Sequence, residues 1–256
     1  MQIICDTHLH SNNSHDSKAS LRDICELALT KGLKIVATSE HVFWDSRDVG
    51  YGYFNLESYL EDVRNCRDIY KGKLKVLSGI EVSEPNLYPE KFTNLCRSSV
   101  DSMVGSLHWL AYGFFGDPKV LAKIDHQRLV EDYEKAVLKV VEYGGFDSFA
   151  HLDLIKRYVK VDESQVSPGM VAILKSMVGQ DIALEMNTST IRRDMQEPAA
   201  SHALVEMYLA LGGKRLTVGS DAHRIEDVGA DFDQIPKKFY PYIGYFEKRI
   251  FTKMRQ

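Results

Sequence analysis

Short apolar segments alternate with longer amphipathic segments along almost the whole chain, and this alternation restricts the possible folds more than any other feature. The apolar segments are residues 2–5, 34–39, 74–80, 102–107, 148–150, 182–186 and 216–219. Most are continuously apolar, as expected for parallel strands that are buried on both faces. The segments between them, 21–31, 56–70, 127–143, 168–178 and 198–211, are predicted helices, several with Pro near the start or Gly after the end. The pattern predicts an α/β fold with a parallel sheet.

The seven predicted strands favour a closed barrel of the (β/α) type, formed by a single domain over residues 1–256. An open, doubly wound sheet is the structural alternative. The Gly-x-Gly-x-x-Gly sequence of a dinucleotide-binding fold does not follow the first predicted strand. Residues 240–256 are aromatic and basic, and we expect them to form a last helix on the outside or rim of the barrel.

Charge and composition exclude several classes of protein. Lys and Arg total 32 and Asp and Glu total 36, so the net charge of −4 argues against a nucleic-acid or anionic-membrane partner. No segment approaches the roughly 18 apolar residues of a membrane-spanning helix, and the first ten residues do not resemble a secretory signal. The four cysteines form no C-x-x-C pair and are expected to be reduced thiols. We therefore expect a cytoplasmic protein.

Six of the nine histidines follow predicted strands, and one glutamate does the same. These residues are His8, His10, His41, His108, His151, His223 and Glu81. In a parallel barrel, all strands end on one face, and that face carries the active site. We therefore expect these side chains to converge. His126 and His202 lie on predicted helices and are assigned to solvated or packing roles.

The local spacing of these residues indicates a metal site. Asp6, His8 and His10 are two residues apart, as are Asp221 and His223, so each set points to one side of an extended backbone. Neutral imidazoles and carboxylates are ligands of zinc, iron and manganese. Burial of so many of them together would be costly unless metal ions offset the charge of the carboxylates.

Six motifs in order along the chain resemble those of the PHP (polymerase and histidinol phosphatase) family. They are DTHLH at 6–10, SEH at 39–41, GIE at 79–81, GSLH at 105–108, AHLDLIKRY at 150–158 and GSDAH at 219–223. The segments HLDLIKRY and EMNTSTIRR resemble the histidinol-phosphatase branch. The resemblance implies a distorted (β/α)7 TIM-like barrel that holds three divalent metal ions and hydrolyses a small phosphorylated metabolite. The expected reaction converts L-histidinol phosphate to L-histidinol and phosphate by a metal-activated hydroxide.

The resemblance also implies three groups of metal ligands. The first is His8, His10, Glu81 and Asp221, and the second is Glu81, His108 and His151, so that Glu81 bridges two ions. The third is His41, His223 and Asp16, with His15 as the alternative to Asp16. Asp6 is expected to support a ligating histidine from outside. Glu40 should point away from His41 because neighbouring residues in a strand alternate in direction.

Phosphate hydrolysis requires positive groups at the phosphate oxygens, and arginine supplies them in bidentate form. Arg157 follows the fifth predicted strand and Arg192 the sixth, and the resemblance assigns both to the phosphate; Arg193 is the neighbouring candidate. Thr190 stands where many relatives have Gly, which puts the position of Arg192 in question. Asp221, His223 and a metal-bound water are the candidates for proton transfer to the leaving alkoxide.

Aromatic residues follow the second and fourth predicted strands and could form a pocket wall or could pack the loops. They are Phe43, Trp44, Trp109, Tyr112, Phe114 and Phe115. Glu84 and Asp117 are the carboxylates considered for the ammonium group of histidinol phosphate.

Three other functions are alternatives for a chain with these motifs. A PHP-type phosphoesterase for another small ester, such as a nucleotide or sugar phosphate, would have the same metal site. An amidohydrolase would have a carboxylated Lys at a strand end, where this chain has Glu81 and His108. A non-catalytic scaffold would have lost ligands, whereas all nine expected positions carry competent side chains. The native metal and the oligomeric state are left open.

Overall fold

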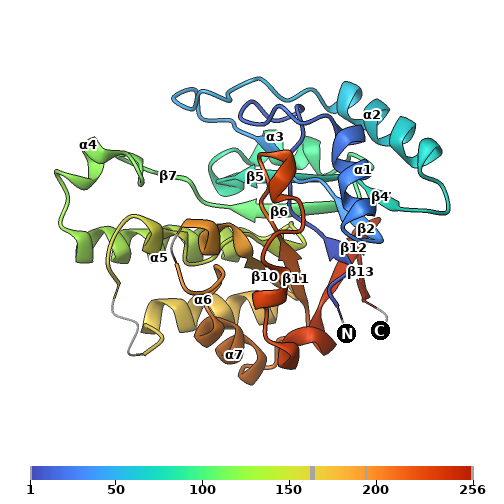
Figure 1. Ribbon diagram of the computed structural model, residues 1–256. Coiled ribbons are helices and arrows are strands. Elements are labelled where there is room, and N and C mark those ends of the chain that lie inside the picture. Colours follow the sequence, from blue (N-terminus) through green and yellow to red (C-terminus); the bar gives the residue numbers. More distant parts are fainter. Residues whose placement is uncertain (1, 162–164, 194, 255–256) are drawn as a thin grey trace.

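Parallel strands form the centre of the protein in the computed structural model, which describes residues 2–161, 165–193 and 195–254 (Figure 1). Six strands form one sheet in the order β11-β10-β9-β6-β5-β3, with parallel neighbours throughout. These are β3 (Glu40–Val42), β5 (Gly79–Ser83), β6 (Ser102–Ser106), β9 (Ser148–Phe149), β10 (Ala183–Asn187) and β11 (Leu216–Gly219). The strands β1 (Cys5–Asp6), β2 (Ile35–Ala37) and β4 (Lys75–Leu77) form a second parallel sheet. The predicted α/β class with a parallel sheet is confirmed.

The predicted strand 34–39 contains β2 alone, because Thr38 and Ser39 separate β2 from β3 in the other sheet. The predicted strand 74–80 is divided between the two sheets, with Ser78 separating β4 from β5. At the second break, the carboxylate of Asp101 accepts hydrogen bonds from the backbone N–H and the hydroxyl of Ser78, each at 2.9 Å. Side-chain acceptors of this kind replace ladder partners and allow the strand to change its neighbours.

The segment that follows β1 contacts strands from both sheets. The backbone N–H of Thr7 donates to the carbonyl of Val218 in β11 at 2.9 Å, and Ser39 donates to the carbonyl of Leu9 at 2.8 Å. Leu9 also forms a parallel bridge with Ala222. The chain after β1 therefore lies between the end of β11 and the junction of β2 with β3.

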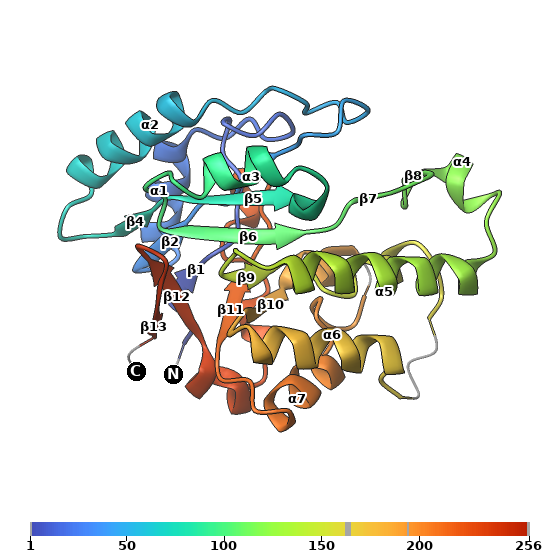
Figure 2. The same ribbon diagram turned by 180° about the vertical axis from the view of Figure 1, so that it is seen from behind.

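Helices connect the strands and cover the sheets. They are α1 (Leu21–Thr30), α2 (Leu56–Ile69), α3 (Pro89–Leu95), α4 (Pro118–Leu121), α5 (His126–Tyr143), α6 (Pro168–Gly179) and α7 (His202–Ala210). The first two helices are capped by side chains, since Ser20 accepts from the N–H of Asp23 and Asn55 from that of Ser58. Figure 2 shows α5 and α6 side by side along the six-stranded sheet. None of the helices within the described ranges is long and apolar enough to cross a membrane.

Burial of one face of α5 shows how the helices are held. Its buried residues are Leu129, Tyr133, Val137, Val140 and Val141, spaced three to four residues apart. Burial of each large apolar side chain contributes about 1.5–3 kcal/mol. The hydroxyl of Tyr133 donates to the carbonyl of Leu152 at 3.1 Å, so this helix also holds the loop that follows β9.

The predicted start of the helix over residues 198–211 was wrong. We expected a helix from residue 198, but α7 begins at His202. The backbone N–H groups of Ala199 and Ala200 donate to the carbonyls of Asn187 and Glu185, at 2.9 and 3.1 Å. These bonds to β10 compete with helix formation, so the residues after Pro198 follow the sheet before the helix starts.

The predicted C-terminal helix was also wrong, because residues 244–253 form a hairpin of β12 (Gly244–Glu247) and β13 (Ile250–Lys253). Lys248 and Arg249, at its turn, have positive φ angles of 52° and 65°. Two consecutive residues of this kind form the tight turn that joins antiparallel strands. A bridge between Ile243 and Leu216 places the hairpin at the amino end of β11. Residues 255–256 of the predicted helix lie outside the described residues.

Candidate metal centre

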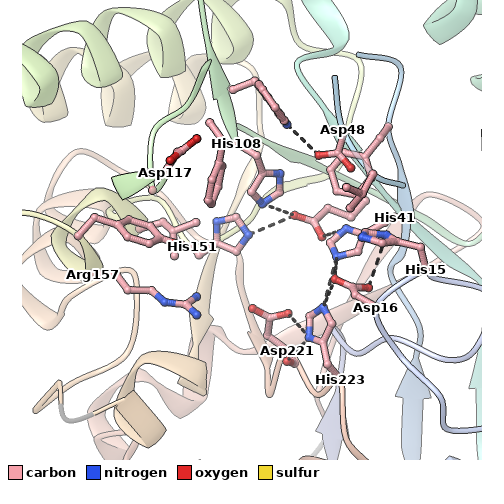
Figure 3. Close-up of a pocket in the computed structure, with 18 of the residues that line it drawn as sticks. His15, Asp16, His41, Asp48, His108, Asp117, His151, Arg157, Asp221 and His223 are labelled. Carbon is pink, nitrogen blue, oxygen red and sulfur yellow. Dashed lines mark hydrogen bonds and ion pairs between the residues drawn. The ribbon is translucent and has the colours of Figure 1, made fainter. Parts of the chain in front are cut away.

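The predicted ligands converge at the carboxyl ends of the strands, where Figure 3 shows many of them around one cavity. His8 and His10 follow β1, His41 lies in β3, Glu81 lies in β5, His108 follows β6, His151 follows β9, and Asp221 and His223 follow β11. Asp16 joins them from the loop between β1 and α1. Six strand ends thus contribute to one site, as the positions of the histidines in the sequence predicted.

The first expected ligand group is closely packed. Nε2 of His8 lies 3.2 Å from Nε2 of His10 and 3.3 Å from Oε2 of Glu81. Nε2 of His10 lies 3.2 Å from Oδ1 of Asp221. Two imidazoles and two carboxylates therefore direct their ligating atoms at a common point, and His8, His10 and Glu81 are buried.

Glu81 also belongs to the second expected group. Its other oxygen, Oε1, lies 3.1 Å from Nε2 of His151 and 3.7 Å from Nε2 of His108. The two oxygens of this one carboxylate thus face different sets of histidines. This is the arrangement required of a residue that bridges two ions.

The third expected group contains Asp16. Its Oδ2 lies 3.1 Å from Nε2 of His223 and 3.4 Å from Nε2 of His41, and the two histidine nitrogens are 3.3 Å apart. His15, the alternative ligand, lies with Nδ1 3.9 Å from Oδ1 of Asp16 and packs its ring edge-on against Phe43. The structure brings Asp16 together with the two histidines.

Groups outside the ligand set fix the orientation of the rings. Nδ1 of His8 lies 2.7 Å from Oε2 of Glu185, and Nδ1 of His108 lies 2.6 Å from the hydroxyl of Ser83. Nδ1 of His223 lies 3.0 Å from the carbonyl of Asp221. These contacts select the tautomer in which Nε2 is free to bind a metal. Sequence reasoning assigned no role to Ser83 or Glu185, and the only signal for Glu185 was its two-residue spacing from Asn187 at a strand end.

Two buried acids next to the ligands hold nearby loops: Asp6 accepts hydrogen bonds from backbone N–H groups, and Glu40 accepts them from serine hydroxyls. Asp6 accepts hydrogen bonds from the N–H of Ser220 at 3.0 Å and of Gly229 at 2.9 Å, and it receives no histidine ring N–H. It therefore holds the loop that carries Asp221, which differs from the expected support of a histidine ring. Glu40 is buried and accepts from the hydroxyls of Ser11 and Ser14, each at 2.6 Å, which is a structural role.

The electrostatics of the cluster fit bound cations. Burial favours the neutral forms of Glu81 and Asp221, but the facing histidines outweigh burial and hold the pKa of each carboxyl well below its usual range. Burial also lowers the pKa of His10, and the neighbouring His41 and His223 lower it further. The facing carboxylates raise the pKa of His8 and of His41 despite burial, so these rings would release a proton when a cation binds. Carboxylates and imidazoles together are the donor set of divalent transition metals.

The spacing of the ligand atoms points to the same conclusion. Each of three sets of ligand atoms lies within 4.8 Å: His8, His10 and Glu81; Glu81, His108 and His151; and His10, His41 and His223. A neutral imidazole has one donor and one acceptor nitrogen. Nδ1 of His8 faces Glu185. If Nδ1 carries the proton in the neutral forms of His8 and His10, then Nε2 of each ring is an acceptor, and these two acceptors face each other. A metal ion satisfies both acceptors, so the residues fit divalent metal ions.

The backbone is strained at two of the ligands. His151 has a φ of 33° and Asp221 a φ of 51°, both in the left-handed region that residues with a side chain seldom adopt. Strain of this kind persists where the surrounding structure enforces it and is concentrated at functional sites. Nearby, a Cβ atom on Gly219 would overlap the Cβ of His8, so glycine allows β11 to approach the ligand-bearing segment.

The arginines are arranged differently from the prediction. Arg157 lines the cavity, as expected, and its guanidinium points toward the ligands in Figure 3. Arg192 is absent from the cavity lining: its guanidinium lies 3.4 Å from Asp227 and 3.3 Å from Asp231 and donates to the carbonyl of Ser220. Arg193 lines the cavity in its place. The 3₁₀ helix Thr188–Arg193, with the hydroxyl of Thr190 donating to the carbonyl of Glu197 at 2.9 Å, sets this orientation.

Some of the six aromatic candidates line the cavity, and the others do not. Phe43, Trp109 and Phe114 line the cavity, together with Tyr158. Phe115 is fully buried, Trp44 packs against Tyr88 and Phe92, and Tyr112 is exposed. His126 and His202 lie at the starts of α5 and α7, away from the cavity, in agreement with their predicted packing or solvated roles.

A PHP domain matches residues 6–189, most of the chain. The chain belongs to the PHP family. The matched range contains the ligands from His8 to His151, while Asp221 and His223 lie beyond it. The family resemblance that the motifs indicated is confirmed.

Individual PHP proteins are similar over nearly their full length. The chain is 28% identical to a probable histidinol-phosphatase of Thermotoga maritima, with 96% of this chain and 97% of that protein covered. It is 27% identical to the histidinol-phosphatase of Lactococcus lactis, with 85% and 83% covered. One similar solved structure is the crystal structure of histidinol phosphate phosphatase from Lactococcus lactis complexed with Zn, L-histidinol and phosphate. It superposes on this chain with a TM-score of 0.84 and is 22% identical in sequence, and the match covers 97% of this chain and 98% of that chain. The likeness to that structure shows a shared fold.

Proposed function

We propose that this PHP-family protein is a metal-dependent phosphomonoesterase that hydrolyses L-histidinol phosphate to L-histidinol and phosphate. The observation that carries the proposal is the bridging position of Glu81, between His8 on one side and His151 on the other, at the bottom of a cavity of about 740 Å³. The names of the relatives from Thermotoga maritima and Lactococcus lactis support the choice of substrate.

We assign three divalent ions to the ligand groups, with zinc, iron or manganese as the metals suited to imidazole and carboxylate donors. His8, His10, Glu81 and Asp221 would hold the first, Glu81, His108 and His151 the second, and Asp16, His41 and His223 the third. When bound, such ions supply positive charge and Lewis acidity for the attack of water on phosphorus. Zinc in the related Lactococcus lactis structure supports this assignment.

The protein's own side chains bind and orient the phosphate of a small phosphorylated metabolite. Arg157 and Arg193 reach the cavity and are assigned to the phosphate oxygens, where guanidinium groups bind in bidentate fashion. Arg192 positions the loop of Asp221 through its bond to the carbonyl of Ser220. Asp221 and His223 lie next to each other at the cavity wall and are assigned to proton transfer to the leaving oxygen.

We also propose that the strands close into a distorted (β/α)7 TIM-like barrel within one domain over residues 1–256. Support comes from the hydrogen bonds of the segment after β1, which reach Val218 on one side and Ser39 on the other. A closed arrangement places all strand ends around one opening, where the ligands meet.

The test is phosphate release from L-histidinol phosphate and from a panel of nucleotide and sugar phosphates, on protein whose metal content is counted. We expect preference for L-histidinol phosphate and loss of activity on chelation. His151→Asn should abolish turnover, whereas the control His126→Asn, at an exposed residue outside the cavity, should retain it. Preference for another ester would contradict the substrate, and full activity of metal-free protein would contradict the chemistry.

A further inference from the structure

The lining of the cavity also carries negative charge. Besides the aromatic residues, it includes Asp48 and Asp117. Figure 3 shows Asp48 on the other side of His108 and His151 from Arg157, and Asp117 on the same side as Arg157, with its carboxylate apart from the guanidinium. A substrate with its phosphate at Arg157 would therefore have carboxylates and aromatic rings within the same cavity.

Hydrogen bonds from the protein occupy Asp48 and Glu84, two other acids near this part of the cavity. Oδ2 of Asp48 accepts the indole N–H of Trp109 and Oδ1 accepts the N–H of Gly50, each at 2.8 Å. Glu84, the other acid considered from the sequence, is buried behind the wall and accepts the backbone N–H groups of His108 and Trp109. Both carboxylates are thus occupied by protein donors.

Asp117 retains a free oxygen. Its Oδ1 accepts the N–H of Lys119 at 2.8 Å, which caps α4, and no donor contacts Oδ2 within the described part of the chain. Arg47, another cation of the cavity lining, is paired with Asp45 at 2.5 Å and stacks over Trp109 at 4.8 Å. Asp117 therefore presents a half-buried negative charge that no described cationic side chain neutralises.

The backbone that carries Asp117 is held in place by aromatic packing. A Cβ on Gly116 would lie 2.5 Å from the ring of Tyr158, so the chain at this point rests directly on that ring. Phe114 packs edge-on against the same ring at 5.9 Å. Aromatic faces beside a carboxylate favour an organic cation, because both attract positive charge.

We infer that Asp117 is a specificity-determining residue that binds the ammonium group of the substrate, so that the enzyme selects phosphate esters of amino alcohols. The inference rests on the proposed function and deepens it. The cavity then binds a dipolar substrate at both ends, with cationic arginines at the phosphate and an anionic Asp117 among aromatic rings at the amine.

The test compares Asp117→Asn with the wild type on L-histidinol phosphate and on p-nitrophenyl phosphate, which lacks an ammonium group. Asn caps helices as well as Asp, so this substitution removes the charge and preserves the cap. We expect kcat/KM for L-histidinol phosphate to fall by about tenfold or more, mainly through KM, because a hydrogen-bonded charge pair is lost. Activity on p-nitrophenyl phosphate should be unchanged.

Asp125→Asn is the matched control, since Asp125 caps α5 in the same way and lies outside the cavity lining. It should leave both activities unchanged. Equal losses on both esters in Asp117→Asn, or no loss on either, would overturn the inference and leave the phosphatase activity standing. Release of phosphate from neither ester by the wild type would refute the proposed function and this inference with it.

A second measurement needs no variant. L-histidinol should inhibit the wild-type enzyme about tenfold more strongly than its deaminated analogue, 3-(imidazol-4-yl)propan-1-ol, because only L-histidinol carries the charged amine. Equal inhibition by the two alcohols would overturn the inference.

Discussion

Nδ1 of His8 lies 2.7 Å from Oε2 of Glu185, and both side chains are buried. The carboxylate raises the pKa of His8 against the opposing effect of burial, and it directs the other ring nitrogen toward Glu81 and His10. Glu185 lies in β10, a strand that contributes no proposed ligand of its own. This strand therefore participates in the site by orienting a ligand.

Glu185→Gln should weaken metal binding, because the amide is a poorer acceptor for the ring N–H than the carboxylate. Loss of such an outer contact typically costs 10–100-fold in metal affinity or activity. Competition with a metal indicator dye would measure the affinity. Glu197→Gln, on a residue outside the cavity that pairs with His202, is the control. Equal affinity in the wild type and Glu185→Gln would assign Glu185 a packing role only.

Glu81→Ala should lose two metal ions together, because the carboxylate faces both the His8 and the His151 groups. Asp16→Ala should lose one ion, since Asp16 contacts only His41 and His223 among the proposed ligands. Elemental analysis of purified protein gives the stoichiometry, with Glu90→Ala at an exposed position as the control. Retention of three ions by Glu81→Ala would contradict the bridge.

Most of the ligand set could be predicted for two reasons. The sequence shows which residues come at the end of an apolar strand, and the strands of a parallel sheet all end on the same side. His108 and His151 illustrate this, since they follow β6 and β9, while His41 and Glu81 lie within the short strands β3 and β5. Motif resemblance supplied Asp16, which lies in a loop where no periodicity exists.

The sequence could not decide the features that depend on tertiary contacts. Arg192 and Arg193 are neighbours in a 3₁₀ helix, and pairing of Arg192 with Asp227 and Asp231 determines which one reaches the cavity. Those acids are distant in sequence and carry no local signal. The C-terminal hairpin likewise depends on the turn at Lys248 and Arg249, two residues with no strong turn preference.

Arg157→Ala and Arg193→Ala should each raise KM for phosphate esters about tenfold, because each removes a charged donor from the cavity. Arg192→Ala should instead lower thermal stability by about 1 kcal/mol, since it leaves Asp227 and Asp231 without their partner. Steady-state kinetics and thermal unfolding separate the two effects. A large KM increase in Arg192→Ala with normal stability would return this residue to the phosphate site.

Removal of metal by a chelator should lower the free energy of unfolding as well as the activity. Without cations, the buried carboxylates and imidazoles of the site lose the charge compensation that bound ions give them. Calorimetry of metal-free and metal-reconstituted protein would measure the difference, which should amount to a few kcal/mol at an ion concentration about 100 times the dissociation constant. An unchanged unfolding temperature on removal and on re-addition of metal would show that the folded protein does not bind these ions.

Gly219→Ala should damage the metal centre without changing any ligand. The added Cβ would overlap the Cβ of His8, forcing apart β11 and the segment that carries His8 and His10. Overpacking of this kind costs about 1–3 kcal/mol, and the displaced ligands should bind metal more weakly. Gly179→Ala is the matched control, because a Cβ there meets no atom within 4 Å and the residue ends α6 without a positive φ. Thermal unfolding and metal counting on both variants test the prediction, and normal metal content in Gly219→Ala would show that the two segments can separate without disturbing the ligands.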